Sequence, residues 1–191
     1  MKYLFRIKNR LLVIIILLLG VNYNLKAQTN LGVIQETKME IQSEGKDGKP
    51  FEAYTNLCYM FLNMNNGDFM FKTDINTFES GDTYLDSILN NNGSQPITFK
   101  SNISDNLSRF SNDGDIKMYD TKGVLTINGI DIPCVAQFDP MTFGDKNDQK
   151  NYRLDFRLSV DANKINIKGL ENKLSKQVLL QIARGTINVT N

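Results

Sequence analysis

The chain of 191 residues contains no histidine and no tryptophan, and it has only two cysteines. Without histidine, catalytic triads built on an imidazole base and histidine-ligated metal sites are excluded. Cys58 and Cys134 are too few for a thiolate zinc site. No glycine-rich phosphate-binding loop of the P-loop or dinucleotide type occurs either. The sequence therefore predicts no catalytic residue, no metal and no cofactor.

A pair of carboxylates can catalyse hydrolysis without histidine, as in glycosidases. The acidic residues lie mostly in predicted turns, such as Asp113, Asp115 and Asp145, or on a polar strand face, as Asp155 does. Solvated charge is the simpler interpretation of such positions. A carboxylate hydrolase is therefore retained only as a minor alternative.

The N-terminal residues have the pattern of a secretory signal peptide. Four basic residues among the first ten precede an uninterrupted apolar run, Leu11–Gly20, and a polar stretch then ends at Ala27. This run is shorter than the roughly 20 residues that span a membrane, so cleavage after Ala27 is favoured over a retained anchor. We expect a leader over residues 1–27, one domain over residues 28–191, and a periplasmic or secreted location without a membrane span.

Removal of the leader changes the charge of the chain. Five of the 22 basic residues and none of the 21 acidic residues lie in residues 1–27, so the remainder carries a net charge of −4. A mildly acidic domain with scattered basic residues offers no electrostatic footprint for nucleic acid.

The two cysteines admit two interpretations in an oxidising compartment. Cys58 and Cys134 could form a disulfide bond that stabilises the fold by constraining the unfolded chain. Alternatively, they are two buried thiols that act as small apolar side chains. The sequence leaves both open.

Alternation of apolar and polar residues with period two dominates the chain after the leader. Tyr152–Val160 is the cleanest example, and the predicted strands together lie at 33–43, 51–64, 69–76, 97–103, 115–120, 123–128, 130–138, 152–160, 164–168 and within 178–189. The part Val178–Ile182 could equally be helical. One short helix is predicted at Thr83–Leu89, capped by Ser80 or Asp82. Strands at this spacing argue for an antiparallel barrel or sandwich.

Two local patterns bear on the strand arrangement. Asn128-Gly129 lies between two β-rich runs and predicts a hairpin with a type I′ turn, which needs positive φ at both central residues. Pro133 lacks an amide hydrogen and predicts a bulge or an edge in the following strand.

The segment Leu57–Met64 is apolar on both faces. One solvated face is usual in an antiparallel sheet, so this pattern needs an explanation. Either the helix at Thr83–Leu89 covers the second face, or one face lines an apolar lumen.

Three segments of the chain resemble the YceI-like family of secreted lipid-binding barrels. They are Gly67–Phe71 (G-D-F-x-F), Pro96–Ser101 (P-I-T-F-K-S) and Gly123–Ile130 (G-V-L-T-I-N-G-I). The resemblance implies an all-β fold, an extended lipocalin-like antiparallel β-barrel of about eight strands with one short inserted helix. It also implies a non-enzymatic carrier or storage protein in the periplasm, whose lumen encloses a lipid or polyisoprenoid chain.

Face parity along the strands proposes which side chains line the lumen and contact an apolar small molecule. A one-residue slip in register would turn the candidates of any strand outward. The lumen candidates are Phe69, Phe71, Ile75, Phe99, Leu125, Ile127, Cys134, Ala136, Phe138, Leu154, Phe156 and Leu158.

An alternative function uses the same fold. The barrel would be filled by its own side chains, bind no ligand, and serve as a protein-interaction module of the cell envelope. The outer face of Leu57–Met64 would then form the interface.

Overall fold

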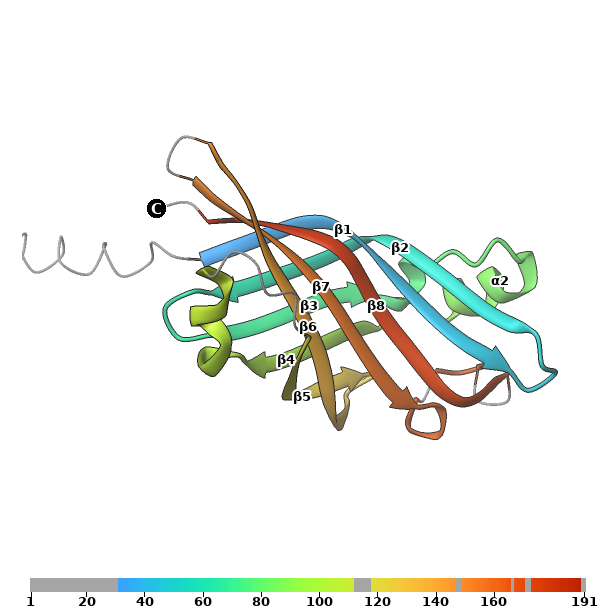
Figure 1. Ribbon diagram of the computed structural model, residues 1–191. Helices are drawn as coiled ribbons and strands as arrows, with labels where there is room; N and C mark the ends of the chain where they lie inside the picture. The colour runs from blue at the N-terminus through green and yellow to red at the C-terminus, as the bar shows by residue number, and fades with distance from the viewer. Residues whose placement is uncertain (1–30, 112–117, 147–148, 166, 171–172, 190–191) are drawn as a thin grey trace, which may run out of the picture.

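The computed structural model describes residues 31–111, 118–146, 149–165, 167–170 and 173–189 (Figure 1). The predicted leader and residues 115–117 of one predicted strand lie outside the described residues. The described part forms one closed antiparallel barrel of eight strands. The strands are β1 (Leu31–Gly45), β2 (Pro50–Asn63), β3 (Asp68–Asp74), β4 (Pro96–Asn102), β5 (Tyr119–Ile127), β6 (Ile130–Lys146), β7 (Gln149–Asp161) and β8 (Leu174–Val189).

Each strand pairs with the next one in the sequence, and β8 closes the sheet by pairing with β1. The predicted all-β barrel of about eight strands is therefore confirmed. Closure gives every strand a neighbour on both sides, which removes the long unpaired edges through which β-proteins aggregate. It also turns one face of every strand toward a common interior.

The hairpin predicted at Asn128-Gly129 is confirmed. Asn128 has φ 51° and Gly129 has φ 74°, and Ile127 lies directly opposite Ile130 at the start of the β5–β6 pairing. Pro133 lies opposite Val124 of β5 without a register shift, so there is no bulge at this position.

Pro133 instead lies where β6 is locally an edge. Among the described residues, the register between β6 and β7 begins at Ala136, which lies opposite Leu158. Position 133 is therefore not required to donate a backbone hydrogen bond to β7, which is where proline is tolerated in a sheet.

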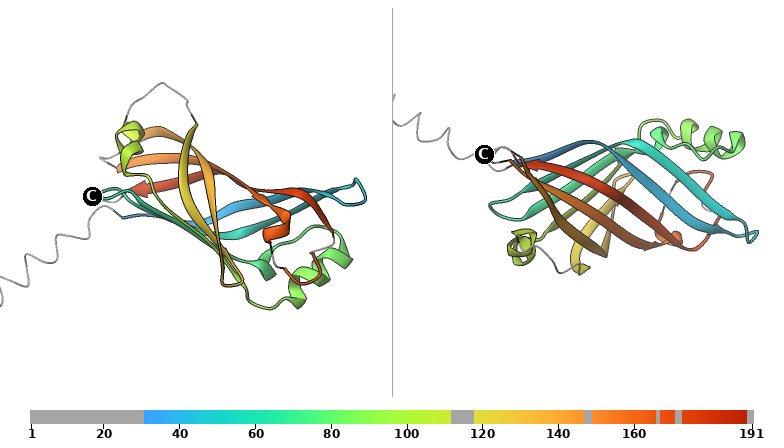
Figure 2. Two further views of the ribbon diagram at one scale, coloured as in Figure 1. Left: turned by 90° about the horizontal axis from the view of Figure 1, so that it is seen from below. Right: turned by 45° about the horizontal axis from the view of Figure 1, so that its top comes forward.

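The single α-helix of the described residues, α2 (Thr83–Asn91), is capped by Asp82 as predicted. The Asp82 carboxylate accepts hydrogen bonds from the amides of Tyr84 and Leu85 at 2.8 and 3.1 Å. In Figures 1 and 2, α2 and the 3₁₀ segment η3 (Ser104–Ser111) lie at opposite ends of the barrel. Leu89 of α2 is fully buried in the core.

The helix does not cover the outer face of β2, so that explanation of the apolar segment is wrong. Leu57 and Tyr59 point outward and are 47% and 41% exposed, whereas Cys58, Met60 and Leu62 point inward and are buried. One face of the segment thus belongs to the barrel interior, and the other meets solvent.

The strand predicted at 164–168 is wrong as well. The chain leaves β7 through the 3₁₀ turn η4 (Ala162–Lys164), and the described residues that follow are irregular. Ile165 and Ile167 are nevertheless buried, because this segment folds over one end of the barrel. We call the segment between η4 and β8, residues 165–173, the covering loop. The alternation of apolar residues at its start reflects packing against the barrel end and not pairing in the sheet.

Two glycines make room for interior side chains. A Cβ at position 123 would overlap the ring of Phe99 and come within 2.6 Å of the carbonyl oxygen of Lys100. A Cβ at position 185 would overlap only the terminal methyl of Met60, the end of a flexible side chain. At both positions the absence of a side chain makes room for a neighbouring interior side chain. Only at Gly123 is the neighbour rigid, since it is an aromatic ring and a backbone carbonyl.

We therefore expect Gly123→Ala to lower the free energy of unfolding by about 1–3 kcal/mol, as overpacking does. Gly185→Ala should cost less than about 1 kcal/mol, since Met60 can rotate away. Denaturant unfolding of both variants measures the difference. Equal losses, or a larger loss for Gly185→Ala, would contradict the packing described here.

Candidate functional site: the barrel interior

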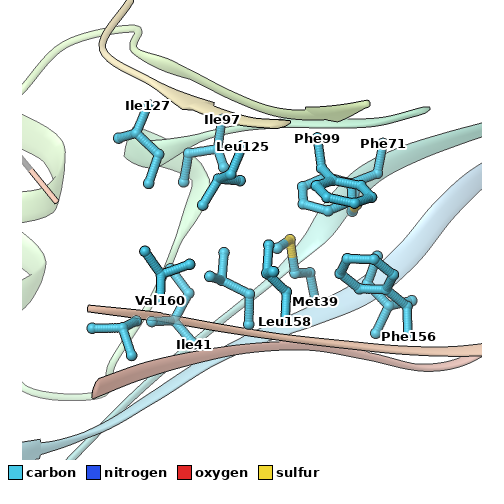
Figure 3. Packing of buried hydrophobic residues seen from close by; sticks show 14 of the residues in the cluster. Met39, Ile41, Phe71, Ile97, Phe99, Leu125, Ile127, Phe156, Leu158 and Val160 are labelled. Carbon is cyan, nitrogen blue, oxygen red and sulfur yellow. The ribbon is translucent and has the colours of Figure 1, made fainter. Parts of the chain in front are cut away.

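The barrel interior is predominantly apolar in the described part of the chain. Side chains from facing strands point toward one another: Ile97 and Leu125 of β4 and β5 lie across from Ile41 and Leu158 of β1 and β7 (Figure 3). The buried polar residues are four threonines: Thr37, Thr55, Thr73 and Thr121. An interior of this composition favours hydrocarbon over any charged or strongly polar ligand.

Five phenylalanines form the centre of this interior. The ring of Phe156 packs against all four others, with centroid distances of 5.2 Å to Phe71, Phe99 and Phe138 and 6.0 Å to Phe69. Most of these contacts are edge-on or tilted, the arrangement that the ring quadrupole favours. The cluster joins β3, β4, β6 and β7 across the barrel.

An aliphatic layer closes the barrel end beside α2. A small apolar void of about 20 Å³ lies there, and its lining residues come from strands, α2 and the covering loop: Ile41, Phe51, Leu89, Ile97, Ile127, Ile165, Ile167, Leu170, Leu174, Val178 and Leu180. A space of this size holds little more than one water molecule. It is far below the roughly 300 Å³ or more of an ordinary ligand pocket.

The structure places the predicted lumen candidates inside the barrel, with one partial exception. Cys134 is half-buried, and Ile75 comes from the 3₁₀ turn η2 (Ile75–Thr77) that follows β3. The fully buried candidates are Phe69, Phe71, Ile75, Phe99, Leu125, Ile127, Ala136, Phe138, Leu154, Phe156 and Leu158. That these residues contact a ligand stays a prediction.

The candidate list missed residues that share the same interior. Met39, Met60 and Ile182 are fully buried among the candidates. The alternation of β1 and β2 already contained Met39 and Met60 as one-face residues, so face parity could have found them. The covering-loop residues, such as Leu170, lie outside any strand and carry no periodic signal.

A single inward hydroxyl lacks a partner in this part of the molecule. Ser101 lies opposite Phe69 and Gly123 on the inner face, and its Oγ is buried without a hydrogen bond among the described residues. By contrast, Thr121 Oγ1 donates to the carbonyl of Asn102 at 3.3 Å. A buried hydroxyl that lacks a partner costs stability unless water or a ligand satisfies it.

Both cysteines are free thiols, so the interpretation as small apolar side chains is the one that the structure supports. Burial raises the pKa of Cys58 to about 12. Burial also raises the pKa of Cys134, whose Sγ lies 3.8 Å from the carbonyl oxygen of Gly123. A raised pKa keeps a thiol protonated and unreactive at neutral pH.

Other chemistry is sparse in the described part of the chain. No group of three or more His, Cys, Asp or Glu residues there could hold a metal ion. Of the described helices, none has the length and apolar character to cross a bilayer.

A closed antiparallel barrel of this kind is the architecture of lipocalin-like barrels. More narrowly, the fold is that of YceI-like proteins, as comparison with solved structures shows. A polyisoprenoid-binding domain from Saccharophagus degradans, implicated in plant cell wall breakdown, superimposes with a TM-score of 0.63 at 10% identity, covering 84% of this chain and 98% of that one.

Two further structures share the fold. BcnA of Burkholderia cenocepacia has a TM-score of 0.52 at 15% identity, with 80% of this chain and 96% of that one covered. A YceI protein of Campylobacter jejuni has a TM-score of 0.50 at 11% identity, with 70% and 81% covered. No family model matches the chain, and no curated protein matches it. The resemblance drawn from the sequence is therefore confirmed at the level of the fold.

The thiol environments predict a difference in reactivity. In native protein at pH 8, iodoacetamide should modify the half-buried Cys134 before Cys58, which should react only after unfolding. Mass spectrometry of digests taken over time measures both rates. Equal modification of the two thiols in native protein would contradict the burial of Cys58.

Proposed function

We propose that the protein is an exported, non-enzymatic binding protein whose barrel takes up an apolar chain, such as a polyisoprenoid or another lipid. The observation that carries the proposal is the uncharged, predominantly apolar interior, set in a fold shared with a domain described as polyisoprenoid-binding. An apolar chain gains about 0.8 kcal/mol for each methylene that it buries. A barrel interior without charge is suited to such a ligand.

Uptake requires movement of side chains, because the described interior is closely packed. Met60 is the residue best suited to move, since its terminal methyl occupies the space that Gly185 leaves free. Methionine is unbranched and changes rotamer at low cost. Burial of a chain of several methylenes would offset that rearrangement.

The unpartnered hydroxyl of Ser101 supports a ligand that carries one polar group. Ser101 faces the interior next to Phe69, so an alcohol, amide or carbonyl on an otherwise apolar chain could satisfy it. A hydrogen bond of this kind fixes the position of a ligand that apolar contacts alone leave free to slide.

The close packing of the interior also favours a second candidate. A barrel filled by its own side chains would bind no ligand and act through its outer surface. Tyr54, Leu57 and Tyr59 on β2 are each more than 40% exposed and would be the centre of such an interface.

Lipid extraction separates the two candidates. Protein purified from its own host and examined by native mass spectrometry should carry a lipid adduct that organic solvent removes. The stripped protein should then take up the fluorescent apolar probe N-phenyl-1-naphthylamine. A protein with neither adduct nor probe uptake would overturn the binding function and leave the second candidate.

Variants on β2 sharpen this test. Met60→Ala should bind the probe about tenfold more tightly, because the vacated space admits roughly two more methylene-sized groups. Tyr59→Ala, the outward neighbour on the same strand, serves as the matched control and should leave probe affinity unchanged. Circular dichroism confirms that both variants fold. Equal affinities in the two variants would place the probe outside the barrel.

Export is tested separately. When the full chain is expressed in a bacterial host, the periplasmic fraction should contain protein with the intact mass of residues 28–191. Recovery of the uncleaved chain in the membrane fraction would show a retained anchor and contradict the leader.

A further inference from the structure

An outer cleft lies at the barrel end that α2 covers. Its volume is about 380 Å³, within the range of ligand pockets. Its lining residues come from the turn between β1 and β2, from the start of α2, and from Lys173 at the end of the covering loop. Lysines and aspartates both line the cleft, so its charge does not select a ligand. The feature that distinguishes it is its position next to the barrel interior.

Phe51 separates the cleft from the interior. Of the described residues, it alone lines both the cleft and the apolar void of about 20 Å³ at this barrel end, and its side chain is 5% exposed. The helix α2 also borders both spaces, with Leu85 on the cleft and Leu89 on the void. Movement of one aromatic ring and of the helix beside it would therefore join the two spaces.

The helix α2 is held to the sheet at its two flanks. Glu79 exchanges two backbone hydrogen bonds with Tyr54 of β2, both 2.9 Å long, and the carbonyl of Gln95 accepts one from the amide of Ile75 at 3.0 Å. All residues of α2 itself are described, and Leu89 is the one among them that is buried. A segment with fixed flanks and few buried side chains is drawn from the least stable part of a fold, as active-site lids are.

The side chain of Asn92 joins the end of α2 to the covering loop, which lies beside the helix (Figure 2). Its Nδ2 donates hydrogen bonds to the carbonyl oxygens of Ile88 at 2.7 Å and Lys168 at 2.9 Å. Its Oδ1 and the Oε1 of Gln95 are buried without a hydrogen-bond partner among the described residues. A buried acceptor without a partner costs stability, and displacement of α2 would expose both oxygens to water.

From these contacts we infer that α2 is a lid, and that an apolar chain enters the barrel beneath it, from the cleft and past Phe51. Asn92 is a positioning residue, since it touches no ligand and acts by holding α2 against the covering loop. The inference rests on the proposed binding function and adds the route of entry to it.

A reversible crosslink between α2 and the covering loop tests the lid. A Cβ at Gly169 would lie 3.8 Å from the Cβ of Ile88, which matches the geometry of a disulfide bond. The variant I88C/G169C, made with C134A so that the half-buried thiol does not compete, should lock the lid when oxidised with diamide. Stopped-flow fluorescence should then show uptake of N-phenyl-1-naphthylamine about tenfold slower than in the same protein reduced with dithiothreitol.

The variant Asn92→Ala tests the lid without a crosslink, because a cysteine at the φ of 92° of Gly169 is strained. Loss of the hydrogen bond to Lys168 should make uptake and release of the probe both about fivefold faster, the effect of one hydrogen bond. The affinity should stay within about twofold, since a lid changes the route and not the bound state. A merely structural role would not raise both rates at constant affinity.

The matched control is Asn102→Ala at the opposite barrel end. There the side-chain amide of Asn102 likewise donates two hydrogen bonds, each 2.9 Å long. This variant should leave both rates unchanged. Circular dichroism confirms that each variant folds.

Two results would overturn the lid. They are equal uptake rates in the oxidised and reduced forms of the crosslinked variant, and equal rates in Asn92→Ala and Asn102→Ala. In both cases the probe still binds, so the binding function stands and entry lies elsewhere. If the unaltered protein takes up no probe at all, the binding function fails and the lid fails with it.

Discussion

The packing of four phenylalanine rings around Phe156 is the contact on which the rest of the structure depends. These rings come from β3, β4, β6 and β7, so the cluster bridges walls of the barrel that are not neighbours in the sheet. The number of strands and the stagger of their pairing set the diameter of the barrel, and the side chains that meet across the interior fill it. The glycine at position 123 belongs to the same arrangement, because it admits the ring of Phe99.

Local signals in the sequence were sufficient to predict much of the sheet that forms the barrel wall. Asn128-Gly129 determined its hairpin through positive φ angles, and Asp82 determined where the helix begins. The alternation at Tyr152–Val160 predicted its strand and its inward residues correctly, since period two needs only one buried face. The same signal failed at 164–168, because a covering loop with two buried isoleucines, Ile165 and Ile167, has the alternation of a strand without a pairing partner.

The sequence could not show whether the barrel interior is open or filled by side chains. Whether a lumen is open depends on the combined volume of side chains that come from different strands. Met60 and Gly185 are an example, because they contact each other inside the barrel but lie far apart in the chain. Face parity identified Phe156 as inward but could not show that four other rings surround it. Nor could the sequence show whether the apolar outer residues of β2 are covered or exposed, because the position of α2 relative to that strand is a property of the tertiary structure.

The neighbour-to-neighbour order of the strands has a consequence for how the chain assembles. Hairpins between consecutive strands form from nearby residues and can appear as soon as both strands have been synthesised. The pairing of β1 with β8 joins the two ends of the domain, so it must await the final strand. Until then β1 exposes an open edge, and a chain truncated before Leu174 keeps that edge permanently. Such a fragment would be prone to self-association through strand addition. The sixteen residues of β8 therefore protect the barrel from self-association by pairing with the edge of β1.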